Sequence, residues 1–297
     1  MFFKETADLQ KYLKINITSK IASIVPYIND AAPVYLLPYL GNDLYDKLIA
    51  WYDLDDGSTD DNNDVFEKLL PKVQNVLAKF TILLAAPSLD VQLQESGFGV
   101  VQTDKVAPAS TARVKALEDS MEKLGYMAID NLLEFLEKNK DDYADWTNSS
   151  AYTETYKNFI TNTSMFDKMV KIGNSRLKFM ELIPVMDNVE MLIIEPKISK
   201  ELCDEIKGQI KVGEISELNA AILPKIRYAI ANFVAFDQYK DNKYENLANN
   251  FLMMVVNTLD GAPDDYPLYK ASSAYEATKT SNQSYDNSAD NTIYVFN

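Results

Sequence analysis

Apolar residues recur at helical spacing along most of the chain, so the sequence predicts a mainly α-helical protein. Residues 70–86 contain a stripe at the i, i+3, i+4 and i+7 positions of a helix, formed by Val73, Val76, Leu77 and Phe80. Residues 111–139 are expected to form a long amphipathic helix, and residues 151–170 another one. Residues 19–40 are also apolar at helical spacing but contain three prolines, which predict a broken or kinked helix there.

The apolar pattern occurs twice. LLPKVQNVLAKF (residues 69–80) reappears as ILPKIRYAIANF (residues 222–233), 153 positions later. Residues 24–48 also align without a gap to residues 182–206, 158 positions later. The difference of five residues falls in the polar stretch 52–67, where a surface loop tolerates an insertion at little cost. The sequence therefore predicts a tandem duplication of a small helical module.

Two further features are expected outside the repeated helices. Apolar residues alternate around a Ser-Gly pair in residues 88–103, which predicts a β-hairpin projecting from the helical body. The last 37 residues, from Gly261, are polar and are expected to form an extended C-terminal arm. These patterns predict four parts. They are a first helical repeat with the hairpin at residues 1–105, connecting amphipathic helices at 106–172, a second helical repeat at 173–260 and the arm at 261–297.

Candidate interface residues are the exposed apolar positions of these two features. In the hairpin they are Phe98 and Val100. At the end of the arm an apolar run is expected to add an edge strand to a neighbouring subunit, and it consists of Ile293, Tyr294, Val295 and Phe296.

The charge balance excludes some partners. The chain has 29 basic and 44 acidic side chains, a formal net charge of −15. Phosphate binding requires clustered Lys and Arg, which the sequence lacks, so non-specific nucleic-acid binding is not expected. DNA could pass such a surface without adhering to it, and anionic membranes are disfavoured. Since no apolar run approaches about 18 residues and no secretory signal is visible, we expect no membrane segment.

The chemistry available to the chain is also restricted. Histidine is absent and Cys203 is the single cysteine, which removes Ser-His-Asp and Cys-His catalysis and almost every zinc site. The acidic loop at residues 53–67 fails the EF-hand pattern because Tyr52 and Leu54 occupy ligand positions 1 and 3. We therefore expect no enzyme, catalytic residue, metal or cofactor, although a carboxylate-dependent hydrolase stays open because carboxylate pairs form in space rather than in sequence.

The N-terminal region resembles a known family of proteins. LQKYLKI has the form LxxYLxI, and NDAAPVYLLPYLG follows with an Ala-Ala-x-x-Tyr core and a glycine turn. This arrangement resembles the start of small helical head–tail connector proteins of tailed phages. The duplicated layout, including NSRLKFMELIPVMDNVE (residues 174–190), is similar to uncharacterised structural proteins of Bacteroides phages and prophages, including the crAss-like group.

The resemblance implies a structural virion protein at the neck of the particle, assembled in the host cytoplasm. Connector proteins form a ring of many copies beneath the portal, extend the DNA channel and offer a docking surface for tail proteins. The partners implied are further copies of the chain, the portal and tail or neck proteins, with DNA passing nearby without specific binding. The alternative is a helical scaffold or adaptor that binds partners in a bacterial cell.

Overall fold

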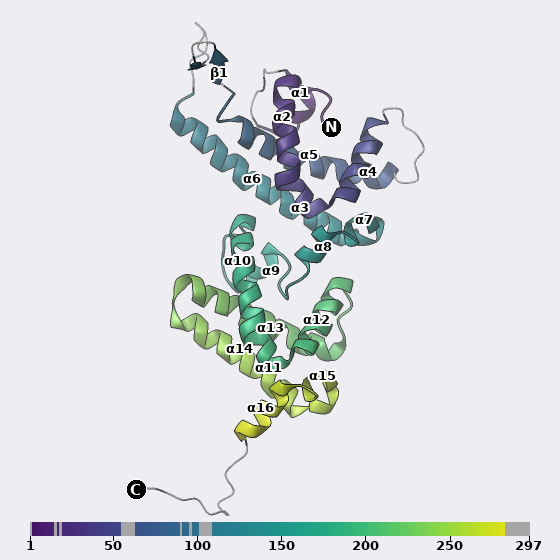
Figure 1. The fold of residues 1–297 in the computed structure, drawn as a ribbon, viewed down its shortest axis with the longest axis vertical. Helices are drawn as coiled ribbons and strands as arrows, with labels where there is room; N and C mark the ends of the chain where they lie inside the picture. Colours follow the sequence, from purple (N-terminus) through teal and green to yellow (C-terminus); the bar gives the residue numbers. More distant parts are fainter. Residues whose placement is uncertain are drawn as a thin grey trace, which may run out of the picture. The chain divides into compact units, whose positions relative to one another are not determined.

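The computed structural model describes residues 2–14, 17, 20–54, 63–89, 91–94, 97–100 and 109–282. This part of the chain is mainly α-helical, which confirms the predicted class (Figure 1). The chain divides into two compact units. Unit 1 comprises Met1–Lys157 and Thr161–Glu181, and unit 2 comprises Asn158–Ile160 and Leu182–Asn297.

The first series of helices lies in residues 1–157. It runs α1 (Thr6–Gln10), α2 (Ile21–Ala31), a π-helical segment η1 (Ala32–Leu36), α3 (Leu37–Leu40), α4 (Asn42–Asp53) and α5 (Asn63–Ala85). It continues with α6 (Thr111–Lys138), a 3-10 turn η2 (Lys140–Asp142), α7 (Ala144–Thr147) and α8 (Ser150–Thr155). Helix α5 packs along both α2 and α6, and their facing apolar stripes form the core.

The second series follows in residues 158–282. It runs α9 (Thr163–Met169), α10 (Arg176–Val189), a π-helical segment η3 (Glu190–Ile194), α11 (Glu195–Ile198), α12 (Lys200–Val212) and α13 (Glu217–Tyr239). It continues with α14 (Asn242–Gly261), a 3-10 turn η4 (Pro263–Asp265), α15 (Pro267–Lys270) and α16 (Ser273–Asn282). Each element of the second series matches, in order and type, an element of the first series from α1 to α8. Helices α13 and α14 pack along each other as α5 and α6 do.

Each series contains one π-helical turn at the same place, and a proline accounts for it. The short helices α3 and α11 follow η1 and η3, and their second residues are Pro38 and Pro196. A proline has no N–H, and its ring clashes with the carbonyl four residues earlier, here that of Val34 or Leu192. Because a wider π turn moves this carbonyl away, the helix continues past the proline instead of ending. The interruption predicted for residues 19–40 corresponds to η1, whereas α2 continues through Pro26.

The backbone after each π-helical turn also repeats. Gly41 ends α3 with φ +80°, and Ser199 ends α11 with φ +77°. A side chain at Gly41 would place its Cβ 2.9 Å from the Cβ of Ser149, so the first series requires glycine there. In the second series the Ser199 hydroxyl accepts the N–H of Leu202 at 3.1 Å, a bond that helps to hold this uncommon conformation.

A tyrosine hydrogen bond recurs as well. The hydroxyl of buried Tyr143 donates to the carbonyl of Val65 at 3.0 Å. The hydroxyl of buried Tyr266 donates to the carbonyl of Leu218 at 3.0 Å. In both cases the residue just before a short helix is fixed to the beginning of the 23-residue helix, α5 or α13. The two series therefore share interior contacts as well as the order of their elements.

Residues 91–100 contain a pair of short strands. Strand β1 (Val91–Gln94) pairs antiparallel with β2 (Gly97–Val100), with Val91 opposite Val100. The side chains of Phe98 and Val100 lie outside the described part.

The extended C-terminal arm predicted from Gly261 is wrong for residues 261–282. Those residues form the end of α14 and then η4, α15 and α16. Tyr266 and Tyr269 are 4% and 0% exposed, and these two aromatic side chains anchor the polar segment to unit 2. Composition alone missed this, because two well-placed tyrosines are enough to fold a polar stretch against a core. Residues 283–297 lie outside the described part.

The helix predicted for residues 151–170 is also interrupted. It consists of α8 and α9, separated by a turn in which Phe159 and Ile160 are buried. The Asn162 side chain caps α9 by accepting the N–H of Met165 at 2.8 Å. The predicted division of the chain differs from the observed one, since α6 packs on α5 within unit 1 rather than belonging to a separate connecting part.

Candidate functional site

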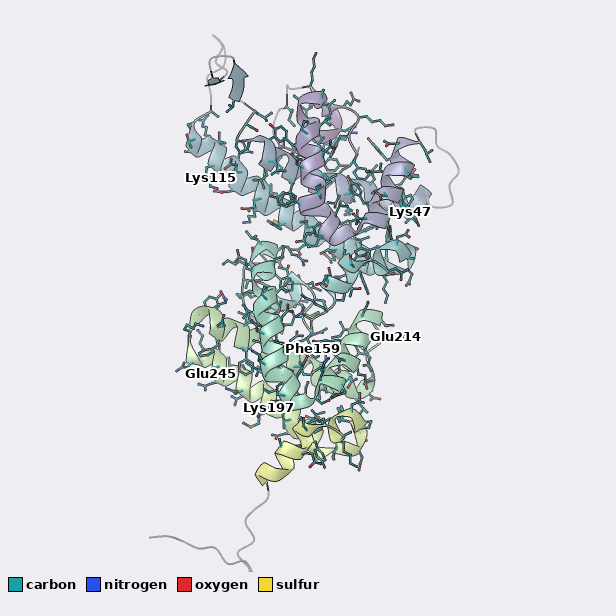
Figure 2. The ribbon with its side chains drawn as sticks, viewed as in Figure 1. Lys47, Lys115, Phe159, Lys197, Glu214 and Glu245 are labelled. Atoms are coloured by element: carbon teal, nitrogen blue, oxygen red, sulfur yellow. The ribbon has the colours of Figure 1, made fainter. Side chains whose placement is uncertain are left out.

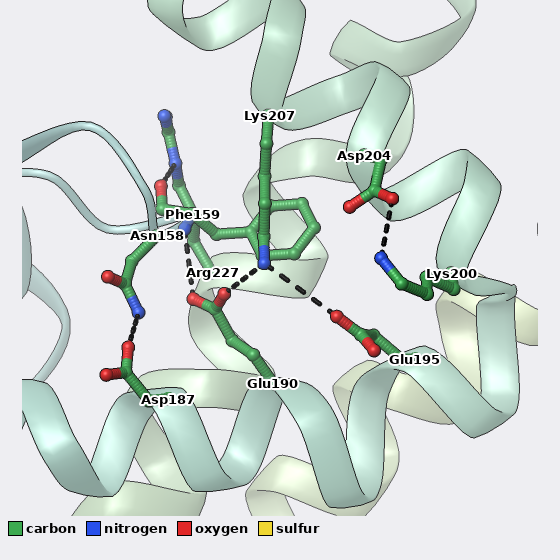
Figure 3. A network of polar contacts seen from close by, with 9 residues as sticks. All are labelled: Asn158, Phe159, Asp187, Glu190, Glu195, Lys200, Asp204, Lys207 and Arg227. Carbon is green, nitrogen blue, oxygen red and sulfur yellow. Dashed lines mark hydrogen bonds and ion pairs between the residues drawn. The ribbon is translucent and has the colours of Figure 1, made fainter. Parts of the chain in front are cut away.

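A buried carboxylate organises the interior of unit 2. Glu190, in η3, is 2% exposed, and its Oε2 lies 2.7 Å from the Nζ of Lys207 in α12 (Figure 3). Its Oε1 accepts the backbone N–H of Phe159 at 3.0 Å. Burial raises the pKa of Glu190 above its ordinary value, while Lys207 and the Phe159 N–H oppose that rise. Lys207 Nζ also lies 4.0 Å from Glu195, so one ammonium faces two carboxylates.

The same cluster holds the segment that begins the second series. Arg227, in α13, donates its Nε–H to the carbonyl of Phe159 at 2.8 Å. Asn158 donates to Asp187 at 2.6 Å, and the Nζ of Lys207 lies 5.1 Å from the centre of the Phe159 ring (Figure 3). Both backbone polar groups and the ring of Phe159 thus have partners inside unit 2. The cluster gives hydrogen-bond partners to the polar groups of a buried chain segment, and buried polar groups require such partners.

Unit 1 holds its own N-terminal segment in a related way. Gln74, in α5, donates to the carbonyl of Phe2 at 2.6 Å, and Phe2 and Phe3 are 1% and 0% exposed. Gln74 and Arg227 are separated by the same 153 positions as the repeated prolines of α5 and α13. Each 23-residue helix therefore uses an equivalent side chain to bind the carbonyl of a buried phenylalanine, Phe2 or Phe159. This position is structural in both units.

Unit 1 also contains a polar cavity of about 410 Å³, lined by parts of α6, α9 and α10. Asp130 Oδ1 accepts the hydroxyl of Thr163 at 3.0 Å and lies 3.4 Å from Nη1 of Arg176. Partial burial raises the pKa values of Asp130 and Glu137, two half-buried carboxyl groups of its wall. Arg176 is 4% exposed, its guanidinium lies 5.3 Å from the ring centre of Tyr39, and its Nε has no hydrogen-bond partner in the described part. Two carboxyl groups with raised pKa values beside a cavity are the element of this chain most suited to acid–base chemistry.

Other reactive or ligating groups are sparse in the described residues. Cys203 lies fully buried in α12, and burial raises its pKa, so the group is held as a thiol and packs as a small apolar side chain. No cluster of three or more Asp, Glu or Cys side chains suited to a metal ion occurs among the residues that the structure describes. None of the described helices has the length and apolar content needed to cross a membrane.

The outer surface of α14 is unusual for so acidic a chain. The helix has no charged residue between Glu245, labelled in Figure 2, and Asp260. Within this stretch Leu247, Met253 and Met254 are 45%, 58% and 49% exposed. The corresponding stretch of α6, residues 123–136, carries three charged side chains, Lys123, Asp130 and Glu134.

An aromatic pair extends this uncharged surface onto α13. Tyr228 of α13 is 39% exposed and stacks on Phe251 of α14, with ring centres 5.0 Å apart. Farther along the pair of helices, Lys225 Nζ lies 3.4 Å from the hydroxyl of Thr258. We call the surface formed by Tyr228, Leu247, Phe251, Met253 and Met254 the α14 face. Depletion of charge and enrichment in Met and aromatic residues are typical of protein–protein interface cores.

The described part of the chain does not test the interface residues predicted from the sequence. The side chains of Phe98 and Val100, and the whole of Ile293, Tyr294, Val295 and Phe296, lie outside it, so these predictions stand as they were made. The α14 face was missed by sequence reasoning, although a signal was present. Fourteen consecutive residues without charge, 246–259, in a chain with 25% charged residues would have identified it.

Comparison with known proteins gives a family and no nearer relative. A family model described as a family of unknown function (DUF6712) matches residues 36–156 and 231–279. No curated protein and no solved structure matches the chain. The two matched stretches include α3 to α8, the strands, the end of α13, all of α14 and α15, and part of α16. Since they cover more than half of the sequence, the chain belongs to the DUF6712 family.

Proposed function

We propose that this chain is a structural subunit of the head–tail junction of a tailed phage. It is a neck or connector protein that acts through protein–protein contacts and surrounds the path of the DNA. The observation that carries the proposal is the repeat of one helical module, because the first copy of that module contains the residues that resemble connector proteins.

The proposal takes the two series of helices as duplicates of one module of about ten elements. Three kinds of observation support this duplication: the matching order of elements, the π turns ahead of Pro38 and Pro196, and the equivalent tyrosine hydrogen bonds. The second stretch of the family match, residues 231–279, also covers elements whose counterparts lie in the first stretch. Chance similarity of two helical units would not reproduce π turns and interior hydrogen bonds at matching positions.

The charge of the chain fits a position beside DNA. With a formal charge of −15, a wall built from many copies repels the phosphate backbone and lets the DNA slide. The predicted interface residues Phe98, Val100 and Ile293 to Phe296 belong to this proposal as contacts with neighbouring subunits, the portal or tail proteins.

The direct test combines the full chain with the purified portal encoded in the same genome. Native mass spectrometry and electron microscopy are expected to detect a closed oligomer of the chain bound to the portal ring. A chain that stays unbound beside an intact portal over micromolar concentrations would overturn the proposal. Truncation after residue 292 is the matched variant, and we expect it to weaken assembly while the far-UV circular dichroism of the chain is unchanged.

An adaptor in a bacterial cell is the alternative within the class of binding proteins. It would use the same helical surfaces on a cellular partner. Genes for terminase, portal and capsid proteins next to this one favour the virion role, and their absence over the surrounding region favours the adaptor.

A carboxylate-dependent hydrolase is the second candidate because of one observation, the cavity with Asp130 and Glu137. Carboxyl groups with raised pKa values are suited to general acid catalysis. Turnover of glycoside or ester substrates that is lost in both Asp130→Asn and Glu137→Gln would support this candidate. Turnover that is absent, or equal in the two variants and the natural chain, would eliminate it.

A further inference from the structure

The α14 face is exposed and uncharged, and it contains several apolar side chains rather than one. Met253, Met254 and Leu247 each leave about half of their surface to solvent. Residues 246–259 also include Asn246, Asn250 and Asn257, all exposed. Exposed apolar residues occur singly on most proteins, but a contiguous group without charge marks an interaction site.

The charge of the whole chain limits which partner this face suits. Two copies with a formal charge of −15 each repel one another at most points of contact. Along residues 246–259 this repulsion is smallest, because neither copy places a charged side chain there. A basic partner, by contrast, would gain most at the acidic parts of the surface and nothing at this one. The charge pattern therefore favours a second copy of the chain as the occupant.

The chemistry of the face is also self-complementary. An asparagine amide both donates and accepts hydrogen bonds, so two copies of Asn250 or Asn246 can pair across a two-fold axis. Methionine side chains adapt their shape to another methionine or leucine. A two-fold contact needs a surface that matches itself, and a face of Asn, Met, Leu and aromatic side chains meets that condition.

The size of the face fits a weak pair. The uncharged stretch, residues 246–259, has 14 residues, and a helix of that length spans about 21 Å. With α13 packed about 10 Å from it, the pair offers a surface roughly 20 Å wide. A contact over this area buries about 400 Å² on each copy, or about 800 Å² in total, which is the size of a weak interface.

We propose that the α14 face joins two copies of this chain in a two-fold contact, α14 against α14. The contact goes beyond the proposed function, since it requires neither portal nor DNA. A cyclic ring has no two-fold axis between neighbouring subunits, so this contact belongs to the free chain and not to the wall of the proposed ring.

The first test measures the association of the full chain without other proteins. Sedimentation velocity from 1 to 100 μM is expected to detect a dimer of the natural chain. The substitution Met254→Glu is expected to raise the dissociation constant of this dimer roughly tenfold or more, since the two glutamates would place like charges near the two-fold axis. The matched control is Leu124→Glu in α6. Leu124 is 38% exposed and lies 123 positions before Leu247, the spacing that separates Tyr143 from Tyr266.

The results of these measurements decide whether a second copy of the chain occupies the α14 face. A dimer weakened by Met254→Glu and unaffected by Leu124→Glu supports the proposal, provided that circular dichroism of both variants matches the natural chain. A monomer at 100 μM overturns it, as does association that both variants or neither variant weakens. A monomeric chain that nevertheless binds the portal would overturn this contact and leave the proposed function intact.

A cross-link gives an independent measurement of the axis. Asn250→Cys places a thiol on the face, and the natural Cys203 is fully buried and does not compete. Under mild oxidation we expect a covalent dimer in this variant, whereas Cys placed at Leu124 remains monomeric. Equal cross-linking of the two variants would contradict the two-fold contact.

Discussion

Replacing Glu190 by alanine is expected to destabilise unit 2 by about 4 kcal/mol, the sum of the lower ends of two costs. The change removes the acceptor of the Phe159 N–H, and an unsatisfied buried donor costs about 1–3 kcal/mol. It also leaves the ammonium of Lys207 without its partner at 2.7 Å. Loss of one partner of a buried ion pair costs about 3–5 kcal/mol. The lower end of this range applies here, because the Lys207 side chain is 19% exposed and Glu195 lies nearby.

The first series of helices supplies the compensating change. At the positions equivalent to Glu190 and Lys207, 158 residues earlier, it has Ala32 and Ile49. The double variant Glu190→Ala/Lys207→Ile therefore copies an arrangement that the chain already uses without an ion pair. We expect it to recover about 1–2 kcal/mol of the loss, because the unpaired charge is gone while the Phe159 N–H still lacks its acceptor.

The assay can follow the two units separately. Both tryptophans, Trp51 and Trp146, lie in unit 1, so urea unfolding detected by tryptophan fluorescence reports that unit. Far-UV circular dichroism reports the helices of both units. Glu190→Ala is expected to lower the midpoint of the dichroism transition of unit 2 and to leave the fluorescence midpoint unchanged. A loss below about 1 kcal/mol, or a double variant no more stable than the single one, would refute the reasoning.

Four further substitutions test other contacts. Asp167 accepts the N–H groups of two nearby residues, and these bonds lower its pKa to about 2. The natural chain is therefore expected to be more stable than Asp167→Asn above about pH 4, and this advantage is expected to disappear as the pH falls to about 2. The difference in Tm between the two proteins measures it. Gly125→Ala would place a Cβ 2.6 Å from the Phe80 ring between α5 and α6, so we expect a loss of about 1–3 kcal/mol in the fluorescence transition, and an unchanged midpoint would contradict this contact. Tyr143→Phe and Tyr266→Phe each remove one hydrogen bond worth about 1 kcal/mol, and only the first should move the fluorescence midpoint.

The sequence by itself determined the helical class and much of the repeated pattern. Apolar spacing identified α5, α6 and α13 because each must bury one stripe, and the stripe is written directly in the order of residues. It also indicated an interrupted helix at the prolines of residues 19–40, where the π-helical segment η1 lies, since a missing N–H and a ring clash are local effects. The absence of histidine limited the chemistry before any contact was known.

Only the tertiary structure decided which side chains meet. The pairing of Glu190 with Lys207 and Phe159 joins residues from three parts of the chain, and no local pattern specifies such a set. Tyr266 and Tyr269 folded a segment whose composition indicated an extended arm, because burial depends on a complementary surface elsewhere in the molecule. The α14 face was visible only as a stretch without charge until the fold determined which of its residues point outward. Local propensity follows from neighbours in sequence, whereas burial, pKa and exposure follow from neighbours in space.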